Sequence, residues 1–224
     1  MRLLTILCFS IFYSCFGQAT REPDRFDDNK FEKYIDSFKS MSLPIVLDRK
    51  NVFDLSKVIY DTLEMKYKMN LFSIFCDEHE KYIPRNLKNN HPTNNFRYLF
   101  ALQSKDNISP LIIAKDYFRE GEQFKLKIFL ICYDRRGKVL GYEEIAGYNI
   151  DIQEKFAEIT EDFRIISKDY VFEEAPENRS PNLFYLSETE RVYDVNENGE
   201  IIKLNSTSKI GYYKGDWKGY HFVK

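Results

Sequence analysis

Apolar residues in the first third of the chain recur at the spacing of an α-helix. Two such stripes are Phe31, Tyr34, Ile35 and Phe38, and Leu55, Val58, Ile59 and Leu63. Steps of three, four and seven residues place each set on one face of a helix. Acidic side chains precede both stripes, at Asp27, Asp28 and Asp54, where they favour the start of a helix. We therefore predict one or two helices, at residues 28–40 and from Asp54 onward, within a helical part of about 27–70.

After about residue 95 the apolar positions change to a period of two, with many strand-forming residues. Residues 124–133 carry apolar side chains on both faces, which is typical of a central strand. Asp134–Lys138 and Asn196–Glu200 each place glycine fourth in a polar turn, and they predict two hairpins. Because helices come first and strands afterwards, we predict an α+β fold, with a mainly antiparallel sheet of about six to nine strands in residues 96–224.

The first eighteen residues have the pattern of a signal peptide. Arg2 gives a positive start, and the apolar run Leu3–Phe16 is shorter than the ~20 residues that cross a bilayer as a helix. Cys15 and Gly17 supply small residues at the spacing that signal peptidase accepts. We therefore predict cleavage near Gly17, export to the periplasm or outer envelope, and a single α+β domain at residues 19–224.

A second form of export stays open at Cys15. Bacterial lipoproteins are cut just before a cysteine, which then carries the lipid. Phe12 and Tyr13 depart from the usual residues before such a cysteine. The alternative to a soluble exported protein is therefore a form that is anchored to the membrane by a lipid at Cys15.

Composition narrows the class of protein. A chain of 224 residues with 43% apolar side chains is long enough for one ordinary globular domain. Its net charge of −2 gives no general attraction to nucleic acid, so nucleic acid is not an expected partner. The unusual feature is the 19 Phe, 16 Tyr and one Trp. Aromatic residues favour strands, and they offer large contact areas to a ligand.

Two cysteines of the predicted mature chain lie inside apolar runs. Cys76 ends the run 71–76, and Cys132 ends the run 128–132. In an oxidising compartment they are candidates for a disulfide. Two buried thiols are the alternative, because free cysteine behaves as a small apolar residue.

Sequence motifs for catalysis are absent. The chain has no Gly-x-Ser-x-Gly elbow and no phosphate-binding glycine loop, and it has only three histidines. The run Cys76–Glu80 concentrates potential metal ligands, but consecutive residues cannot all point at one ion. The acidic doublets that a hydrolase would need are Glu143-Glu144, Glu161-Asp162 and Glu173-Glu174. Among 35 acidic residues such doublets arise freely, so we predict no catalytic residue, metal or cofactor.

The last sixteen residues form the most particular segment. Its rings make a candidate binding surface for a sugar ring or a partner protein: Tyr212, Tyr213, Trp217 and Tyr220. Packing in the core of a sheet is the alternative role for these rings. The stretch Gly211–Tyr220 resembles one hairpin of a MORN-type repeat, with its Tyr-x-Gly-x-Trp core. That resemblance implies a hairpin only, since such repeats work when several are stacked.

A wider resemblance covers the order of the segments. After a signal peptide come Leu43-Pro44-Ile45, a strand and turn at Lys127–Val139, and a late turn at Tyr193–Ile201. This order resembles a group of small, uncharacterised exported proteins of Gram-negative bacteria. The resemblance implies export and carries no catalytic residue.

The sequence therefore favours an exported, non-catalytic binding or interaction domain whose partner is an envelope protein or a glycan. One alternative is a carboxylate-dependent envelope hydrolase, which requires two buried, convergent acids in a cleft. Another is an immunity-type inhibitor of a periplasmic toxin. The near-neutral charge does not favour that reading, because an inhibitor of a basic nuclease is usually strongly acidic.

Overall fold

The computed structural model describes residues 28–64, 78–88, 94–104, 107–117, 125–149, 152–176 and 182–223. The predicted signal peptide, Cys15 and Cys76 lie outside these residues. The elements are α1 (Asp28–Ile35), β1 (Lys39–Met41), β2 (Ile45–Leu47), α2 (Arg49–Glu64), the 3₁₀ turns η1 (Glu80–Tyr82) and η2 (Arg85–Leu87), β3 (Asn94–Leu102), β4 (Ser109–Tyr117), β5 (Lys125–Tyr133), β6 (Val139–Asn149), β7 (Gln153–Ile159), β8 (Ile165–Phe172), β9 (Phe184–Val195), β10 (Ile201–Asp216) and β11 (Gly219–Phe222).

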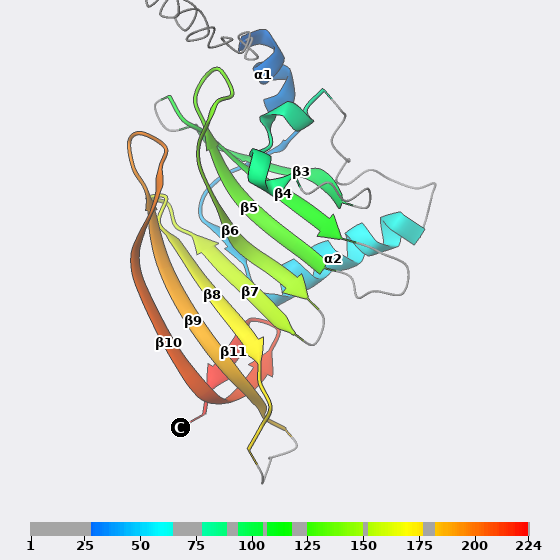
Figure 1. Cartoon of the computed structure of the whole chain (residues 1–224), viewed down its shortest axis with the longest axis vertical. Helices are drawn as coiled ribbons and strands as arrows, with labels where there is room; N and C mark the ends of the chain where they lie inside the picture. The colour runs from blue at the N-terminus through cyan, green and yellow to red at the C-terminus, as the bar shows by residue number, and fades with distance from the viewer. Residues whose placement is uncertain are drawn as a thin grey trace, which may run out of the picture.

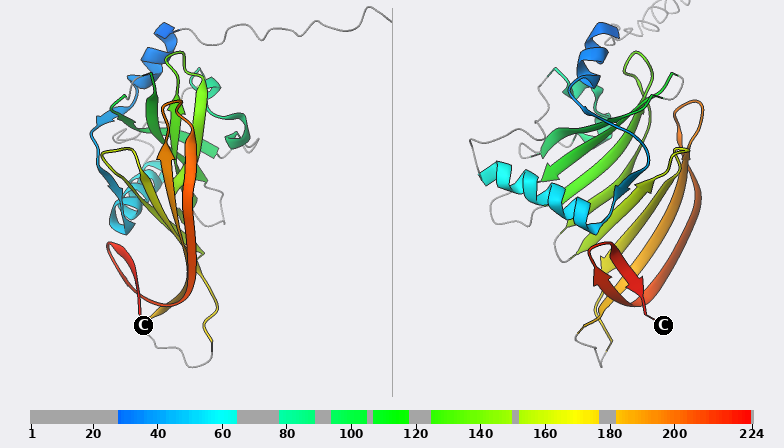
Figure 2. Two further views of the ribbon diagram at one scale, coloured as in Figure 1. Left: turned by 90° about the vertical axis from the view of Figure 1, so that its left-hand side faces the viewer. Right: turned by 180° about the vertical axis from the view of Figure 1, so that it is seen from behind.

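The strands of this described part form one eleven-stranded sheet. Its order is β1-β3-β4-β5-β6-β7-β8-β9-β10-β11, with β2 paired to β7 off this path. Neighbouring strands are antiparallel, except that β1 runs parallel to β3. The sheet is strongly twisted, and α2 lies across one of its faces (Figure 1, Figure 2). A mainly antiparallel sheet with two helices agrees with the predicted class.

The predicted number of six to nine strands is wrong, because the sheet has eleven. β1 and β2 have three residues each and β11 has four, which is too short to show a period. β7 reads Gln-Glu-Lys-Phe-Ala-Glu-Ile, and its charged residues hide the alternation of a strand, although most of them are buried. β9 and β10 instead join shorter segments that the sequence separates.

Alternate residues of β4 and β5 enter two different hydrophobic cores. The first core takes Ile112, Ala114, Leu126, Ile128, Leu130 and Cys132, and the second takes Leu111, Ile113, Phe129, Ile131 and Tyr133. Val52 of α2 belongs to the first core, while Phe31 and Tyr34 of α1 and Tyr82 of η1 belong to the second. The prediction of a central strand covered on both faces is therefore confirmed for β5.

Both helices have other limits than the sequence predicts. α1 ends at Ile35, and the chain continues into β1 instead of reaching residue 40. α2 begins at Arg49 rather than near Asp54. The cap is Asp48, whose Oδ1 accepts the backbone N–H of Asn51 at 2.8 Å. An aspartate in this position satisfies a free N–H of the first helical turn, so the helix starts earlier than the apolar stripe suggests.

The two predicted hairpin turns share one geometry. Asp134 Oδ1 accepts backbone N–H groups of Arg136 and Lys138, and Asn196 Oδ1 accepts those of Asn198 and Glu200. Gly137 has φ +82° and Gly199 has φ +76°. Glycine adopts this left-handed conformation without the steric cost that a Cβ atom brings. The turn prediction is therefore confirmed at both places.

Strand β10 is long, and only one of its edges is fully paired. The inner edge pairs with β9 from Ile201 to Tyr213. The outer edge pairs with β11 only from Tyr213 to Asp216, and no other described strand pairs with it. The register of β10 also shifts between Lys203 and Asn205, where the strand carries an irregularity. Residues 202–210 are exposed.

Candidate ligand-binding pocket

The turn between β10 and β11 folds back over the first turn of α2 (Figure 2). The backbone N–H of Lys50, in that first turn, donates to the carbonyl of Trp217 at 2.9 Å. Within the hairpin, Asp216 Oδ1 accepts the backbone N–H of Lys218 at 2.7 Å and that of Gly219 at 3.1 Å. These bonds hold the backbone of Trp217 beside the first turn of α2.

A cavity of about 310 Å³ lies at this junction. Its lining comes from α2, β6, β7 and the hairpin: Arg49, Phe53, Tyr148, Glu154, Gly215, Asp216 and Trp217. The Phe53 ring lies 6.0 Å from the Tyr148 ring at 85° and 6.2 Å from the Trp217 ring at 57°. Trp217 is 64% exposed, and Phe53 is 38% exposed. Three rings thus surround a space of the size that small ligands occupy, roughly 300 Å³ upward. We call this cavity the hairpin pocket.

An ion pair lies at the sheet side of the hairpin pocket. Arg49 Nε donates to Glu154 Oε2 at 2.9 Å, and Arg49 Nη2 donates to Glu154 Oε1 at 3.3 Å. The Glu154 side chain is 5% exposed and that of Arg49 is 30% exposed. Burial acts to lower the pKa of Arg49, but the bonds to Glu154 outweigh it and raise that pKa. A two-point contact of this kind fixes the guanidinium plane.

Two neighbours complete the polar surroundings of the hairpin pocket. The Arg49 guanidinium carbon lies 4.9 Å from the centre of the Tyr220 ring, a cation–π distance. Burial and then the nearby Glu154 carboxylate raise the pKa of Tyr220, so its hydroxyl stays protonated. The hydrogen bond to His221 lowers the pKa of Asp216. Asp216 therefore remains a carboxylate under ordinary conditions.

Of the four rings proposed from the sequence as a binding surface, Trp217 lines the hairpin pocket. Tyr220 and Tyr213 are buried in the first core. Tyr212 is half-buried and lies opposite Tyr185 of β9, with ring centres 5.1 Å apart. Neighbouring residues of a strand point to opposite faces, so Tyr212 and Tyr213 do not share one. The structure does not bring the four rings onto one surface.

None of the residues in the three acidic doublets is buried. Glu143 Oε1 accepts the Tyr193 hydroxyl, whereas Glu144 pairs with Lys127 at 2.6 Å. Glu161-Asp162 lies in an exposed turn, and Glu173-Glu174 is exposed as well. The Thr160 hydroxyl lowers the pKa of Asp162.

The three acids buried within the described segments each contact a cation. Asp116 pairs with Arg97, Glu154 with Arg49 and Glu188 with Lys209. Burial raises the pKa of Asp116, while Arg97 opposes that rise. Removing one partner of such a pair leaves an uncompensated buried charge, so each cation stabilises its carboxylate in place.

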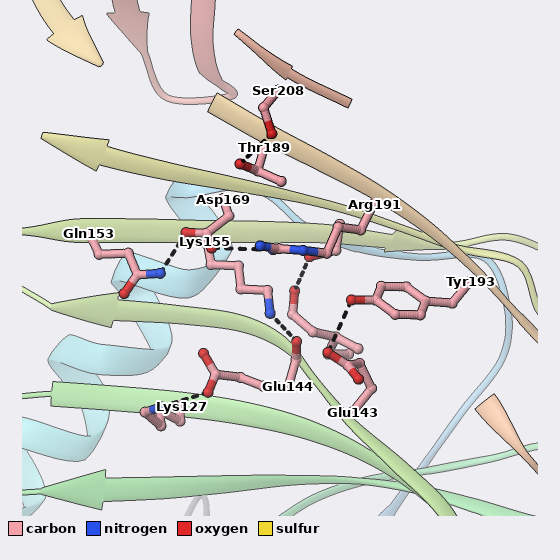
Figure 3. A network of polar contacts seen from close by, with 12 residues as sticks. Lys127, Glu143, Glu144, Gln153, Lys155, Asp169, Thr189, Arg191, Tyr193 and Ser208 are labelled. Carbon is pink, nitrogen blue, oxygen red and sulfur yellow. Dashed lines mark hydrogen bonds and ion pairs between the residues drawn. The ribbon is translucent and has the colours of Figure 1, made fainter. Parts of the chain in front are cut away.

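A charged network lies where β6 separates from β7 (Figure 3). These strands share three residue pairs, Gly147–Asn149 with Gln153–Lys155, and β7 then pairs with β2. Beyond the split, Lys155 Nζ donates to the carbonyl of Glu144, and Ser167 Oγ donates to that of Ile145 at 3.1 Å. Side chains thus satisfy the strand carbonyls that lose a strand partner, as buried carbonyls require.

Other charges surround Lys155 in this network. Asp169 accepts Gln153 Nε2 at 2.6 Å and Arg191 Nη1 at 3.3 Å (Figure 3). Burial lowers the pKa of Lys155, and the nearby acids oppose that effect. The cavity beside the network measures only about 50 Å³, enough for a water molecule but not for a substrate. The network therefore has a structural role: it stabilises the sheet where β6 and β7 separate.

Cys132 and His79 both have structural surroundings. Cys132 is buried in the first core, and burial raises the pKa of its thiol to about 12. The disulfide with Cys76 stays a prediction, because Cys76 lies outside the described residues. His79 Nδ1 lies 2.6 Å from the Tyr98 hydroxyl, beside the ring of Tyr34. Among the described residues, no group of three histidine, cysteine or acidic side chains is placed to hold a metal ion.

The remaining residues of the hairpin pocket could not be found from the sequence. Arg49 and Phe53 come from α2, while Tyr148 and Glu154 stand more than ninety positions later, on β6 and β7. No motif joins these positions. Phe53 carries no usable signal either, because it comes just before the helix that the sequence predicts from Asp54 onward.

Comparisons with known proteins add no relative. No protein-family model matches the chain, and neither the curated proteins nor the solved structures include a significant match. No helix in the described segments combines the length and the apolar character that a membrane crossing requires.

Proposed function

We propose that this protein is an exported, non-catalytic binding domain of the cell envelope and that the hairpin pocket is its ligand site. The observation that carries the proposal is the cavity of about 310 Å³, with three aromatic rings on its walls and a fixed Arg49–Glu154 pair beside them. An apolar cavity with a few oriented polar groups is the usual form of a small-molecule site.

Two further observations support binding without catalysis. Glu154 is the buried acid of the pocket, and both of its oxygens accept hydrogen bonds from Arg49. Asp216 is engaged by backbone N–H groups of its own turn and by His221. A general acid and a general base must instead be available to the bond that is cleaved. The pocket thus provides aromatic contact surface and a fixed Arg49–Glu154 pair for binding, rather than an acid and a base for proton transfer.

The test measures which components of a bacterial envelope digest the purified protein retains and whether it returns them intact. The protein is equilibrated with soluble sugar and peptide fragments, filtered, and the retained fragments are identified by mass spectrometry. We expect specific retention of intact fragments, abolished in the double variant Phe53→Ala/Trp217→Ala. The matched control is Phe222→Ala, which removes a ring of similar exposure, 43%, from the same hairpin outside the pocket.

Far-UV circular dichroism and thermal melting establish that each variant is folded. Equal retention by the wild type and the folded double variant would refute the pocket as the ligand site. Cleavage of the retained fragments, lost in Glu154→Gln, would favour the envelope hydrolase instead. The mass of the mature N-terminus, measured separately in membrane and soluble fractions, distinguishes cleavage near Gly17 from lipidation at Cys15.

A further inference from the structure

The walls of the hairpin pocket meet at angles and do not form a flat platform. The planes of Phe53 and Tyr148 are nearly perpendicular, at 85°, and those of Phe53 and Trp217 are inclined by 57°. Neither neighbour lies parallel to the Phe53 ring, so Phe53 forms no parallel sandwich with either of them around a flat aromatic ligand. A puckered ring fits such a corner better, because it presents C–H groups in several directions to the negative faces of aromatic rings.

The charges of the lining disfavour an ionic ligand of either sign. Arg49 brings one positive charge, and Glu154 and Asp216 bring two negative charges. An anion would lie beside both carboxylates and would compete with Glu154 for the guanidinium. A cation would lie beside Arg49 and would compete with it for Glu154. Within a partly buried site, such like-charge contacts are screened less than on an open surface.

The same groups retain hydrogen-bonding capacity for a neutral ligand. The contacts seen in the described residues use three of the five N–H groups of Arg49: Nε and Nη2 donate to Glu154, and Nη1 donates to the Asp216 carbonyl at 3.4 Å. Each Glu154 oxygen has a second lone pair, since a carboxylate accepts about four hydrogen bonds. Donors and acceptors thus stand side by side, which matches neighbouring hydroxyls of one molecule.

Resting on the proposed function, we infer that the ligand of the hairpin pocket is an uncharged sugar ring. Its C–H faces pack in the corner formed by Phe53, Tyr148 and Trp217, and its hydroxyls bind the Arg49–Glu154 pair. The volume of about 310 Å³ stands at the lower end of small-ligand sites, roughly 300 to 1,000 Å³, and accommodates one ring rather than a chain of rings. Trp217 is 64% exposed, so the pocket opens to solvent on that side and a longer glycan extends outward there.

The chain supplies its own reporter for this inference. It contains one tryptophan, Trp217, and that residue lines the hairpin pocket. Selective excitation of tryptophan in the purified protein therefore reads the pocket directly. The probes are methyl α-glucoside, methyl α-galactoside and N-acetylglucosamine as neutral sugars, choline as a cation and gluconate as an anion.

We expect at least one neutral sugar to change Trp217 emission saturably and to protect the ring from quenching by acrylamide. Choline and gluconate produce neither effect. Glu154→Gln weakens sugar binding roughly tenfold, because hydrogen bonds to charged groups are stronger than neutral ones. Ser208→Ala, a change on β10 whose hydroxyl contacts Thr189, leaves the affinity unchanged.

Each contrary outcome has a distinct meaning. Saturable binding of choline or gluconate alone overturns the sugar assignment and leaves the pocket as a ligand site. Failure of all sugars, together with retained envelope fragments that depend on Phe53 and Trp217, also overturns the sugar assignment while the proposed function stands. Sugar binding that persists in the folded variants Glu154→Gln and Phe53→Ala places the sugar elsewhere and overturns the inference.

Discussion

The glycine of the first hairpin turn gives the sharpest prediction about stability. Gly137 has φ +82°, and a Cβ atom added there would lie 2.5 Å from Cδ2 of Phe31 and 2.8 Å from Cε1 of Tyr82. Both rings are buried in the second core, so they have little room to move. The left-handed conformation costs an alanine about 1–2 kcal/mol. Forcing a methyl group into a packed core costs about 1–3 kcal/mol more. We expect Gly137→Ala to destabilise the protein by about 2–5 kcal/mol.

The second hairpin turn supplies a matched control. Gly199 has φ +76° in the same kind of turn, and its added Cβ atom would lie 2.6 Å from Cδ1 of Leu140. That atom is the end of a half-buried, flexible side chain, which can rotate away, whereas Cβ of Leu140 would stay at 3.0 Å, a tight contact but not a severe clash. Gly199→Ala is therefore expected to lose mainly the conformational part, about 1–2 kcal/mol. The difference between the two variants isolates the clash with the rings that attach α1 to the sheet.

The assay is equilibrium unfolding in urea, followed by far-UV circular dichroism. The contact is examined further in a Phe31→Ala background, where the clash has lost its nearest ring. If the reasoning holds, Gly137→Ala costs less in that background than in the wild type, as expected for residues in contact. Equal losses for Gly137→Ala and Gly199→Ala, or full additivity with Phe31→Ala, would refute the reasoning.

Three other predictions concern buried polar groups. Burial lowers the pKa of His79, so the unfolded chain takes up a proton at higher pH than the folded chain does. The free energy of unfolding should therefore decline as the pH falls from about 7 to 5. Urea titrations at several pH values should show a shallower decline for His79→Gln. Lys155→Met deprives the Glu144 carbonyl of its donor and should destabilise the protein by about 2–4 kcal/mol. The control Lys168→Met breaks an exposed ion pair and should cost less than about 1 kcal/mol. Similar losses for the two variants in thermal melts would contradict a structural role of Lys155. Burial raises the pKa of Cys132 to about 12, so peptide mapping should find it alkylated by iodoacetamide only after unfolding under reducing conditions, and labelling of the native protein would contradict its burial.

The sequence predicts the parts of the fold that depend on local pattern. The turns at Asp134 and Asn196 and the central strand β5 follow from side-chain chemistry within a few residues. β7 could not be predicted in the same way. Its buried polar residues, such as Glu154 and Lys155, have partners on α2 and β6, and only the folded chain brings these together. Strand propensity describes each segment by itself, whereas partners from other segments decide whether a charged side chain can be buried.

The hairpin pocket shows the same limit. The aromatic residues of the last segment include Trp217, which lines the pocket. Tyr213 and Tyr220 belong to the same segment and are aromatic as well, but they are core residues. The alternation of side chains along β10 and the reversal of the chain into β11 decide which aromatic residue lines the pocket and which packs in the core. The sequence pattern does not show where β10 ends and the chain reverses. Phe53 contacts Trp217 because α2 begins at Arg49, directly after the cap Asp48 and earlier than its apolar stripe indicates.

The unpaired outer edge of β10 has a consequence for behaviour at high concentration. A row of free backbone N–H and C=O groups is a template on which another strand can add. Along this edge Lys203 and Lys209 supply charge, and the irregularity beside Lys203 interrupts the straight register that a second strand would need. These features protect the molecule from edge-to-edge association despite the exposed Leu204 and Ile210. Neutralising both lysines would remove this charge and leave an unpaired edge to which a strand of another copy of the chain can add.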